Sequence, residues 1–466
     1  MKNKLTIFCT LPLLISLAGC GGDDDRTRVA IGMWPETQQT QDVAMFNIWK
    51  ARFEADNPQY QIVAQPYQYD QTTVAANAMS GTLPTIFQTY FTEPTMLIKN
   101  RYIREVTDIV KELDYYNDME PSMRATLEDD NGLLYGVPRD GYGFGVLMNL
   151  KTLNFYGLIE GDYTKHEYKL YDDEQNPLYP TTYQELLDLG ASLTDVSGGS
   201  VNGTIFYSAN RQGGWLLSNL SWAFGAELQV EVNGKWRSNL ATQELVDTLL
   251  YLQDLKSSGA LPQDKNVFTY NDWYNYIGSR VGFVFAGNDV IQNAVTQAQI
   301  DRRDLAFIPM PEGPEGRYSL YGGTPFVFAR NASDEAVRGA LKFLEYMGRS
   351  PKLSEHSQLA MVEGKETAKA KNEPILPSIR PWTNQTYNTY ADELDEQYVN
   401  INMEYFKDFY NTIDALKHQE EPFFAQEMYD FLDQAVLESL KTPYRSGEEI
   451  MNQLVTLNSQ FNRYFN

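Results

Sequence analysis

The chain has 466 residues, of which 42% are hydrophobic and 13% aromatic, and it is long enough for two globular domains with sizeable cores. It carries 62 acidic residues against 38 lysines and arginines, which gives a formal net charge of -24 at pH 7. A chain this acidic lacks the broad basic surface that nucleic acids and other polyanions require, so we expect no nucleic-acid partner. After the N-terminal segment, no apolar run approaches the length of a membrane span.

The N-terminus has the pattern of an export signal. Lys2 and Lys4 precede an apolar run over residues 5–17 that is too short for a stable membrane span. The run closes with Leu-Ala-Gly-Cys at residues 17–20. We therefore expect residues 1–19 to be a signal peptide and the mature protein to lie outside the cytoplasm.

The Leu-Ala-Gly-Cys ending resembles a bacterial lipobox, which implies acylation of the Cys20 thiol and cleavage just before it. A lipid on Cys20 would hold the protein on the extracytoplasmic face of the cell membrane, with residues 20–28 as a flexible polar tether. An ordinary signal peptide with an incidental cysteine is the alternative. Because Cys9 lies in the signal segment, acylation of Cys20 leaves no thiol for disulfides, thiol catalysis or thiolate metal sites.

The first predicted elements form a β-α-β-α-β sequence. Strands are predicted over residues 29–34, 61–66 and 85–87, and the helices between them over residues 40–55 and 72–79. Strand-like and helix-like segments continue to alternate along the chain. This alternation predicts an α/β protein with largely parallel sheets.

Four later helices are predicted from polar residues that can cap their first turn. Two have the capping-box pattern, in which a Ser or Thr is followed three residues later by Glu, and two have a single capping hydroxyl. The capping-box pairs are Thr182 with Glu185 and Ser446 with Glu449, and the single caps are Thr242 and Ser333.

Patterns that carry catalytic or metal chemistry are scarce. The three histidines, His166, His356 and His418, have no metal-ligand spacing, and neither a nucleophile elbow nor a phosphate-binding Gly-rich loop is present. We therefore predict no metal and no cofactor, and we disfavour serine, cysteine and zinc hydrolases. A pair of carboxylates could still be assembled by the fold, so a surface-anchored glycan hydrolase stays open as an alternative.

Several short sequence blocks follow one another along the chain, at residues 29–34, 53–58, 79–87, 132–138, 147–151, 180–186, 278–283, 308–311 and 322–323. Their order resembles that of bacterial extracellular solute-binding proteins of the maltodextrin-binding type, the carbohydrate-binding lipoproteins of ABC importers. The resemblance covers nearly the whole mature chain. Three positions depart from it: Thr85 replaces the usual Asp, Tyr183 the usual Trp, and Met148 a common Tyr, and these departures leave the sugar unassigned.

The resemblance implies an α/β, two-domain periplasmic-binding-protein-like fold with a hinge and an interdomain ligand cleft. The N-terminal domain would comprise residues 29–140 and 325–376, and the C-terminal domain residues 141–324 and 377–466. The connecting segments would lie near residues 139–144, 323–325 and 377–381. Glycines at 141, 143 and 145 suit the first of these, because glycine tolerates the dihedral changes of a hinge.

The resemblance also implies a function without catalysis. The protein would capture a carbohydrate, an oligosaccharide, in the cleft and deliver it to the permease subunits of an ABC importer. Its only membrane contact would be the lipid on Cys20. A polyamine or a peptide remains an alternative ligand, whereas the shortage of His and Cys disfavours a chelated metal.

A sugar needs aromatic rings for its C–H faces and polar partners for its hydroxyls. Side chains at predicted strand ends and connections supply both. The candidates are Trp34, Glu36, Tyr69, Tyr90, Arg139, Asp140, Tyr142, Trp215, Trp222, Asn288, Asp289, Tyr321, Arg380 and Trp382. Among the tryptophans we expect Trp34, Trp215 and Trp382 to face the cleft, while the helical spacing of Trp222 also fits a core position.

Overall fold

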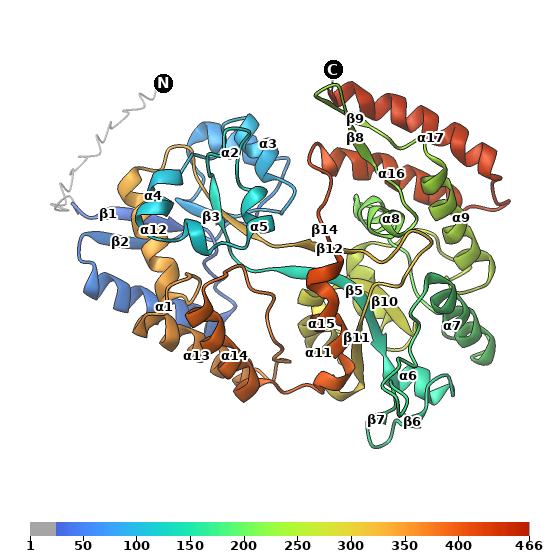
Figure 1. Cartoon of the computed structure of the whole chain (residues 1–466). Helices are drawn as coiled ribbons and strands as arrows, with labels where there is room; N and C mark the ends of the chain where they lie inside the picture. The colour runs from blue at the N-terminus through green and yellow to red at the C-terminus, as the bar shows by residue number, and fades with distance from the viewer. Residues whose placement is uncertain (1–24, 466) are drawn as a thin grey trace, which may run out of the picture.

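The computed structural model describes residues 25–465 and has two lobes joined by extended segments (Figure 1). The predicted signal peptide, Cys20 and the first residues of the tether lie outside the described residues. None of the helices within residues 25–465 combines the length and the apolar character of a membrane span.

The first lobe is built on a five-stranded sheet in the order β2-β1-β3-β13-β4. Strand β1 pairs in parallel with β2 and β3, whereas β13 runs antiparallel to β3 and β4. The strands are β1 (Thr27–Ile31), β2 (Tyr60–Ala64), β3 (Ile86–Gln88), β4 (Gly136–Pro138) and β13 (Pro325–Phe328).

The helices that accompany this sheet are α1 (Thr40–Asp56), α2 (Val74–Ser80), α3 (Pro94–Lys99), α4 (Thr107–Glu112), α5 (Pro121–Ala125), α12 (Asp334–Tyr346), α13 (Glu355–Ala370) and α14 (Gln385–Tyr398). Helix α1 buries Phe46, Trp49 and Phe53. The Phe53 ring packs edge-on against Phe343 and Tyr346 of α12, with centroid distances of 5.4 and 5.3 Å. The apolar face predicted for residues 40–55 therefore forms part of the first-lobe core.

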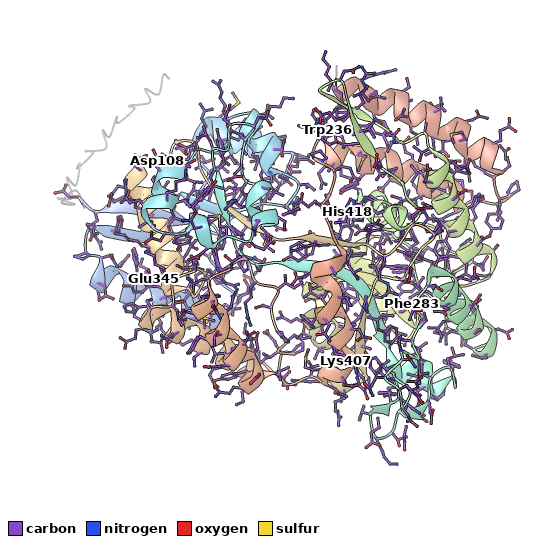
Figure 2. All side chains as sticks on the ribbon, viewed as in Figure 1. Asp108, Trp236, Phe283, Glu345, Lys407 and His418 are labelled. Atoms are coloured by element: carbon purple, nitrogen blue, oxygen red, sulfur yellow. The ribbon has the colours of Figure 1, made fainter. Side chains whose placement is uncertain are left out.

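The second lobe is centred on the long strand β5 (Tyr142–Asn149). Strands β10 (Phe283–Gly287), β11 (Leu305–Pro309) and β12 (Ser319–Gly322) all pair antiparallel with β5, and the short β14 (Lys417–His418) pairs in parallel with β12. Figure 2 shows Phe283 inside this lobe and His418 at the region between the lobes.

Helices and two hairpins surround this sheet. The helices are α6 (Leu150–Phe155), α7 (Tyr183–Val196), α8 (Gln212–Ala223), α9 (Gln243–Ser257), α10 (Trp273–Tyr276), α11 (Ile291–Thr296), α15 (Lys407–Leu416), α16 (Ala425–Ser439) and α17 (Gly447–Phe461). The hairpins are β6 (Gly161–Asp162) with β7 (Glu167–Tyr168) and β8 (Gln229–Val232) with β9 (Lys235–Ser238). Short 3-10 turns in the second lobe are η2 (Tyr270–Asp272), η3 (Asn288–Val290), η4 (Arg302–Asp304), η5 (Met403–Tyr405) and η6 (Asn462–Phe465), whereas η1 (Tyr116–Asp118) lies in the first lobe between α4 and α5.

The predicted helix caps are confirmed. Both capping boxes form, at the start of α7 and of α17. The Thr242 hydroxyl accepts a hydrogen bond from the Leu245 backbone N–H at α9, and the Ser333 hydroxyl accepts one from Ala336 at α12. These bonds satisfy donors that a helix leaves free in its first turn.

The prediction of largely parallel sheets is wrong for the second lobe, where β5 has only antiparallel neighbours. The reason lies in how the chain passes between the lobes. Strand β5 enters the second lobe from the connecting region, and β12 leaves toward it, so the two must run in opposite directions. The same geometry makes β13 antiparallel to β4 in the first lobe.

Within residues 25–465, three connections join the lobes. The first connection lies between β4 and β5, and the second, at Gly323 and Thr324, lies between β12 and β13. We expected the third near residues 377–381, but α14 packs with α13 and Trp382 belongs to the first-lobe core. Backbone hydrogen bonds hold this stretch there, from Glu120 to Pro381 and from Thr383 to Asp118. The third connection therefore follows α14, and residues 382–398 belong to the first lobe.

Candidate ligand-binding cleft

A cavity of about 810 Å³ lies between the two lobes and is lined by both. The first lobe contributes the loops that follow β1, β2 and β3, where sheet ends leave side chains free to meet a ligand. The second lobe contributes residues around the start of α8, the end of β10 and the start of α16. Gly323 and Thr324 of the second connection, together with Tyr142 at the start of β5, lie between the two walls.

Aromatic rings form much of the first-lobe wall. Trp34 follows β1 and is mostly buried, with its ring edge-on to Phe46 at 5.2 Å. Tyr90 follows β3, is 53% exposed, and meets Tyr69 edge-on at 5.2 Å. The Tyr90 ring is therefore held on one side and left open on the other.

A second group of rings comes from the other lobe. The Trp215 ring of α8 packs edge-on against Phe144 at 4.8 Å and against Tyr270 at 5.7 Å. Tyr142 and Tyr429 line the same side of the cavity. Aromatic surface thus faces the cavity from both lobes, which is the arrangement that a sugar ring needs for stacking.

The start of α8 is fixed by one buried carboxylate. Asp433 of α16 accepts hydrogen bonds from the backbone N–H groups of Arg211 and Gly214, both at 2.7 Å. Arg211 adopts a left-handed conformation, with φ of 70°, and its guanidinium pairs with Asp430 at 2.8 Å. This network positions the turn that presents Arg211 and Trp215 to the cavity.

Carboxylates in and behind the cavity have raised pKa values. Burial, together with the nearby charge of Asp140, raises the pKa of Asp289 to about 6, although its side chain is open to the cavity. Burial raises the pKa of Glu420 to about 8, partly offset by a hydrogen bond from the Tyr429 hydroxyl at 2.7 Å. Glu93 lies behind Tyr69, accepts a hydrogen bond from its hydroxyl, and has its pKa raised by burial.

Polar contacts join the lobes around the cavity. Lys417 pairs with Glu120 at 3.2 Å, and the Gln426 amide donates to the Thr92 hydroxyl at 3.1 Å. The Arg211 guanidinium also donates to the Gln71 side chain. The two walls are therefore in direct contact at several points around the cavity.

The structure brings half of the predicted site residues to this cavity. They are Trp34, Glu36, Tyr69, Tyr90, Tyr142, Trp215 and Asp289. Four more lie at the connections without lining the cavity. Arg139 pairs with Asp140 and donates to Gln88. The Asn288 side chain accepts a hydrogen bond from the Gly143 N–H at 3.0 Å. Tyr321 is buried, and the Lys417 ammonium lies over its ring.

The remaining three predicted site residues lie away from the cavity, which corrects the prediction. Trp222 is buried in the second-lobe core and stacks on His418 at 4.0 Å. Arg380 is committed to Asp392 and Asp395, at 2.6 and 2.8 Å. Trp382 is a core residue of the first lobe, because the third connection lies after α14 and not before it.

Other residues that line the cavity were not predicted. They include Gln68, Gln88, Thr89, Arg211, Tyr270, Glu420 and Gln426. Several follow strands that were recognised, so the rule that ligands meet strand ends could have found Gln68 and Thr89. Nothing in the local sequence marks Tyr270 or Glu420, because they reach the cavity only through packing between distant segments.

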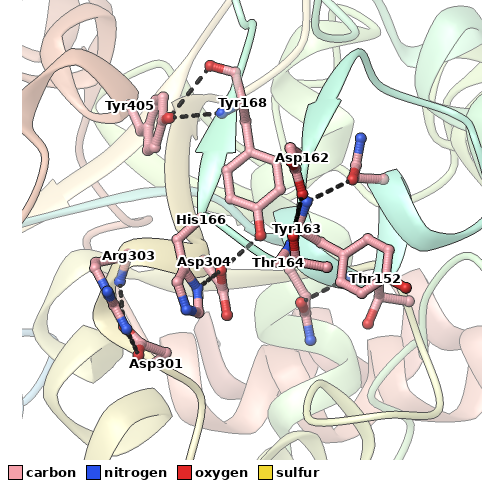
Figure 3. A network of polar contacts seen from close by, with 12 residues as sticks. Thr152, Asp162, Tyr163, Thr164, His166, Tyr168, Asp301, Arg303, Asp304 and Tyr405 are labelled. Atoms are coloured by element: carbon pink, nitrogen blue, oxygen red, sulfur yellow. Dashed lines mark hydrogen bonds and ion pairs between the residues drawn. The ribbon is translucent and has the colours of Figure 1, made fainter.

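A second cavity, of about 430 Å³, lies beside the β6–β7 hairpin. Figure 3 shows its polar network, in which the buried Asp304 carboxylate accepts from the Tyr168 hydroxyl at 2.5 Å and meets His166 Nδ1 at 2.6 Å. The Tyr405 hydroxyl in turn accepts from the Tyr168 backbone N–H at 3.0 Å. These bonds tie the hairpin to η4 and η5, which is a structural role.

The family profile of bacterial extracellular solute-binding proteins matches residues 49–362, and the chain belongs to this family. The expected family and fold class are therefore confirmed, and the family places the protein outside the cytoplasm. Its members are binding proteins, so the chain is a solute-binding protein and not the glycan hydrolase that the sequence left open. No curated protein sequence gives a significant match.

Solved structures share the fold over nearly the whole chain. The cyclic alpha-maltosyl-1,6-maltose binding protein of Arthrobacter globiformis is 16% identical, with a TM-score of 0.65, and the match covers 94% of this chain and 100% of that one. The GacH receptor of Streptomyces glaucescens, solved with acarbose, is 15% identical, with a TM-score of 0.66 and coverages of 95% and 100%. UgpB of Mycobacterium tuberculosis, solved with glycerophosphocholine, is 14% identical, with a TM-score of 0.65 and coverages of 94% and 98%. At these identities the likeness shows the fold.

Proposed function

We propose that this protein is the lipid-anchored receptor of an ABC importer, and that it captures a carbohydrate, an oligosaccharide, between its lobes. The observation that carries the proposal is the cavity of about 810 Å³ with aromatic side chains from both lobes on its walls. Its size falls within the range of roughly 300 to 1,000 Å³ that small-molecule sites occupy. Two of the similar structures are named for sugar-type ligands, a cyclic maltosyl-maltose and acarbose.

The lining supports a sugar in two ways. Trp34, Tyr90 and Trp215 offer ring surface for C–H faces, and amide and carboxyl groups such as Gln88 and Glu420 offer partners for hydroxyls. Both kinds of group are needed, because a buried hydroxyl without a partner costs about 1 to 3 kcal/mol. We infer that the ligand contacts both lobes and stabilises the closed arrangement, with the three connections acting as the hinge.

Anchoring is the second part of the proposal. The lipobox-like ending at Cys20 supports a lipid anchor, which would keep the receptor near the permease subunits that accept its ligand. In cells of the source bacterium, the Cys20→Ser variant should leave the membrane fraction because a hydroxyl cannot form the thioether. Membrane retention of that variant at the wild-type level would defeat the anchor, while the binding function would stand.

The binding function is tested with the mature chain produced without its lipid. A panel of neutral, amino and acidic oligosaccharides, together with peptides and polyamines, is screened by thermal shift. A ligand that binds the folded chain raises its melting temperature, and closure around it compacts the molecule in small-angle X-ray scattering. We expect a saccharide to do both. Stabilisation by a peptide or a polyamine, with no response to any saccharide, would overturn the proposal.

A further inference from the structure

Two carboxyl groups on the second-lobe wall face the cavity. Asp289 follows β10 and Glu420 precedes α16, and both line the cavity. Among the residues that the structure describes, no Lys or Arg forms an ion pair with either one. Burial raises the pKa of the Tyr142 hydroxyl, and the nearby charges of Glu420 and Asp289 add to that rise, so both carboxyl groups lie near Tyr142.

The cations nearest to these groups are already engaged. Arg211 is the only Lys or Arg among the described lining residues, and it pairs with Asp430 and donates to Gln71. Arg139 pairs with Asp140 at 2.6 Å. A carboxylate ligand entering the cavity would therefore meet Asp289 and Glu420 without a free cation to offset them, and an acidic sugar is disfavoured.

Aromatic rings surround the same two carboxylates. Asp289 lies beside Tyr270 and Tyr142, and Glu420 lies beside the Trp215 indole and accepts from the Tyr429 hydroxyl. Ring faces attract cations, and the attraction strengthens when water is excluded. Carboxylates framed by rings form a site that suits an ammonium group.

A separate feature of the opposite wall favours a polar ligand. Thr89 lines the opposite wall, is 2% exposed, and its hydroxyl makes no geometric hydrogen bond within the described residues, although it lies near the Tyr69 hydroxyl. A buried hydroxyl is usually paired, and a ligand group in the cavity would supply the partner. The cavity thus combines rings for a saccharide, an unused hydroxyl and two unpaired carboxylates.

We propose that the ligand of this cleft is an amino sugar, a saccharide whose protonated amine faces the second-lobe wall that carries Asp289 and Glu420. This inference rests on the proposed function of the cleft and narrows its ligand. The sugar rings lie on the aromatic surfaces, and the protonated amine supplies the ion-pair partner that no Lys or Arg of the described residues provides for these two groups. The uncharged N-acetyl or hydroxyl counterpart of the same saccharide lacks that charge and binds more weakly.

The pH dependence follows from the groups around the two carboxylates. Asp289 faces Asp140 and Arg139, and Glu420 faces Glu421, Glu93 and Tyr429. In the empty site their pKa values are about 6 and about 8, so Glu420 is mostly protonated at neutral pH. An ammonium favours the ionised carboxylates, so its binding releases protons, and its affinity rises with pH until the amine itself loses its proton. A neutral sugar that accepts a hydrogen bond from protonated Glu420 shows the opposite trend.

The test uses a glycan array that presents each amino saccharide beside its N-acetylated and its hydroxyl counterpart, with uronic-acid glycans and spermidine as further probes. The best pair is then titrated calorimetrically at several pH values. We expect the amine form to bind at least about tenfold more tightly than its neutral counterparts. The preference should shrink in Asp289→Asn and in Glu420→Gln. Asp173→Asn, at a side chain that is 96% exposed in the second lobe, is the matched control and should keep it.

The outcomes separate the amino-sugar inference from the broader proposal that the protein is a carbohydrate receptor. Tightest binding of a neutral or acidic saccharide, or an amine preference that survives both variants, overturns the amino-sugar inference and leaves the carbohydrate receptor intact. Binding of spermidine with no binding of any saccharide overturns both. Melting temperatures of the variants show whether they are folded, and the ratio of amine to neutral binding is independent of the fraction of active protein.

Discussion

Trp382→Ala tests whether Trp382 is a core residue of the first lobe, as the structure shows, or a ligand contact in the cleft, as the sequence pattern predicted. The side chain is 2% exposed, and its ring meets Tyr115 edge-on at 5.6 Å in the first-lobe core. Its indole N–H has no hydrogen-bond partner within the described residues, so truncation removes packing alone. Replacing a buried Trp with Ala typically lowers the free energy of unfolding by about 3 to 5 kcal/mol.

Urea unfolding followed by fluorescence measures this loss, and calorimetric titration with the identified ligand measures affinity. We expect the stability of Trp382→Ala to fall by that amount, with the affinity of the folded fraction changed less than about threefold. Trp382→Phe keeps a ring against Tyr115 and should lose less stability. A large loss of affinity with unchanged unfolding would show that Trp382 contacts the ligand, and would refute the placement of α14 in the first lobe.

Three further variants test other parts of the account. Tyr90→Ala removes a half-exposed ring and should weaken binding about tenfold with little loss of stability, while Phe155→Ala, at a comparably exposed ring outside the cleft, should leave affinity unchanged. Asp433→Ala removes the acceptor for two N–H groups at the start of α8 and should lower the free energy of unfolding by about 2 to 3 kcal/mol; wild-type stability in urea would contradict this role. Because the pKa of Glu420 is raised to about 8 in the folded chain, unfolding releases its proton, and stability without ligand should fall as pH rises from about 5 to 8. Glu420→Gln should flatten that fall, and an unchanged slope would show that Glu420 does not hold its proton.

The sequence was most informative where a local pattern has a local cause. The capping boxes at Thr182 and Ser446 form because the hydroxyl and the carboxylate that satisfy the first turn lie three residues apart. The apolar spacing of α1 likewise predicts its buried face, since every turn of a helix repeats the same geometry. Family-like blocks in their order then predicted the two-lobed fold.

Features that depend on distant segments could not be predicted in the same way. Pro377 and Pro381 resemble a connection, and Ile379 between them does pack with the second-lobe core. Only the packing of Trp382 on Tyr115 shows that the chain then continues in the first lobe through α14. Trp34 and Trp215 were found because they follow strands or glycines. Glu420 was missed because its role depends on Tyr429 and Trp215, which reach it through the fold.

The central claim is that a saccharide binds between the lobes, and the most direct measurement is a crystal structure of the mature chain with the best glycan from the screen. We expect sugar density that contacts Trp34 or Tyr90 of the first lobe and Trp215 of the second in the same molecule. An empty cleft, with sugar density in the second cavity beside His166 or anywhere else on the protein, would contradict binding between the lobes.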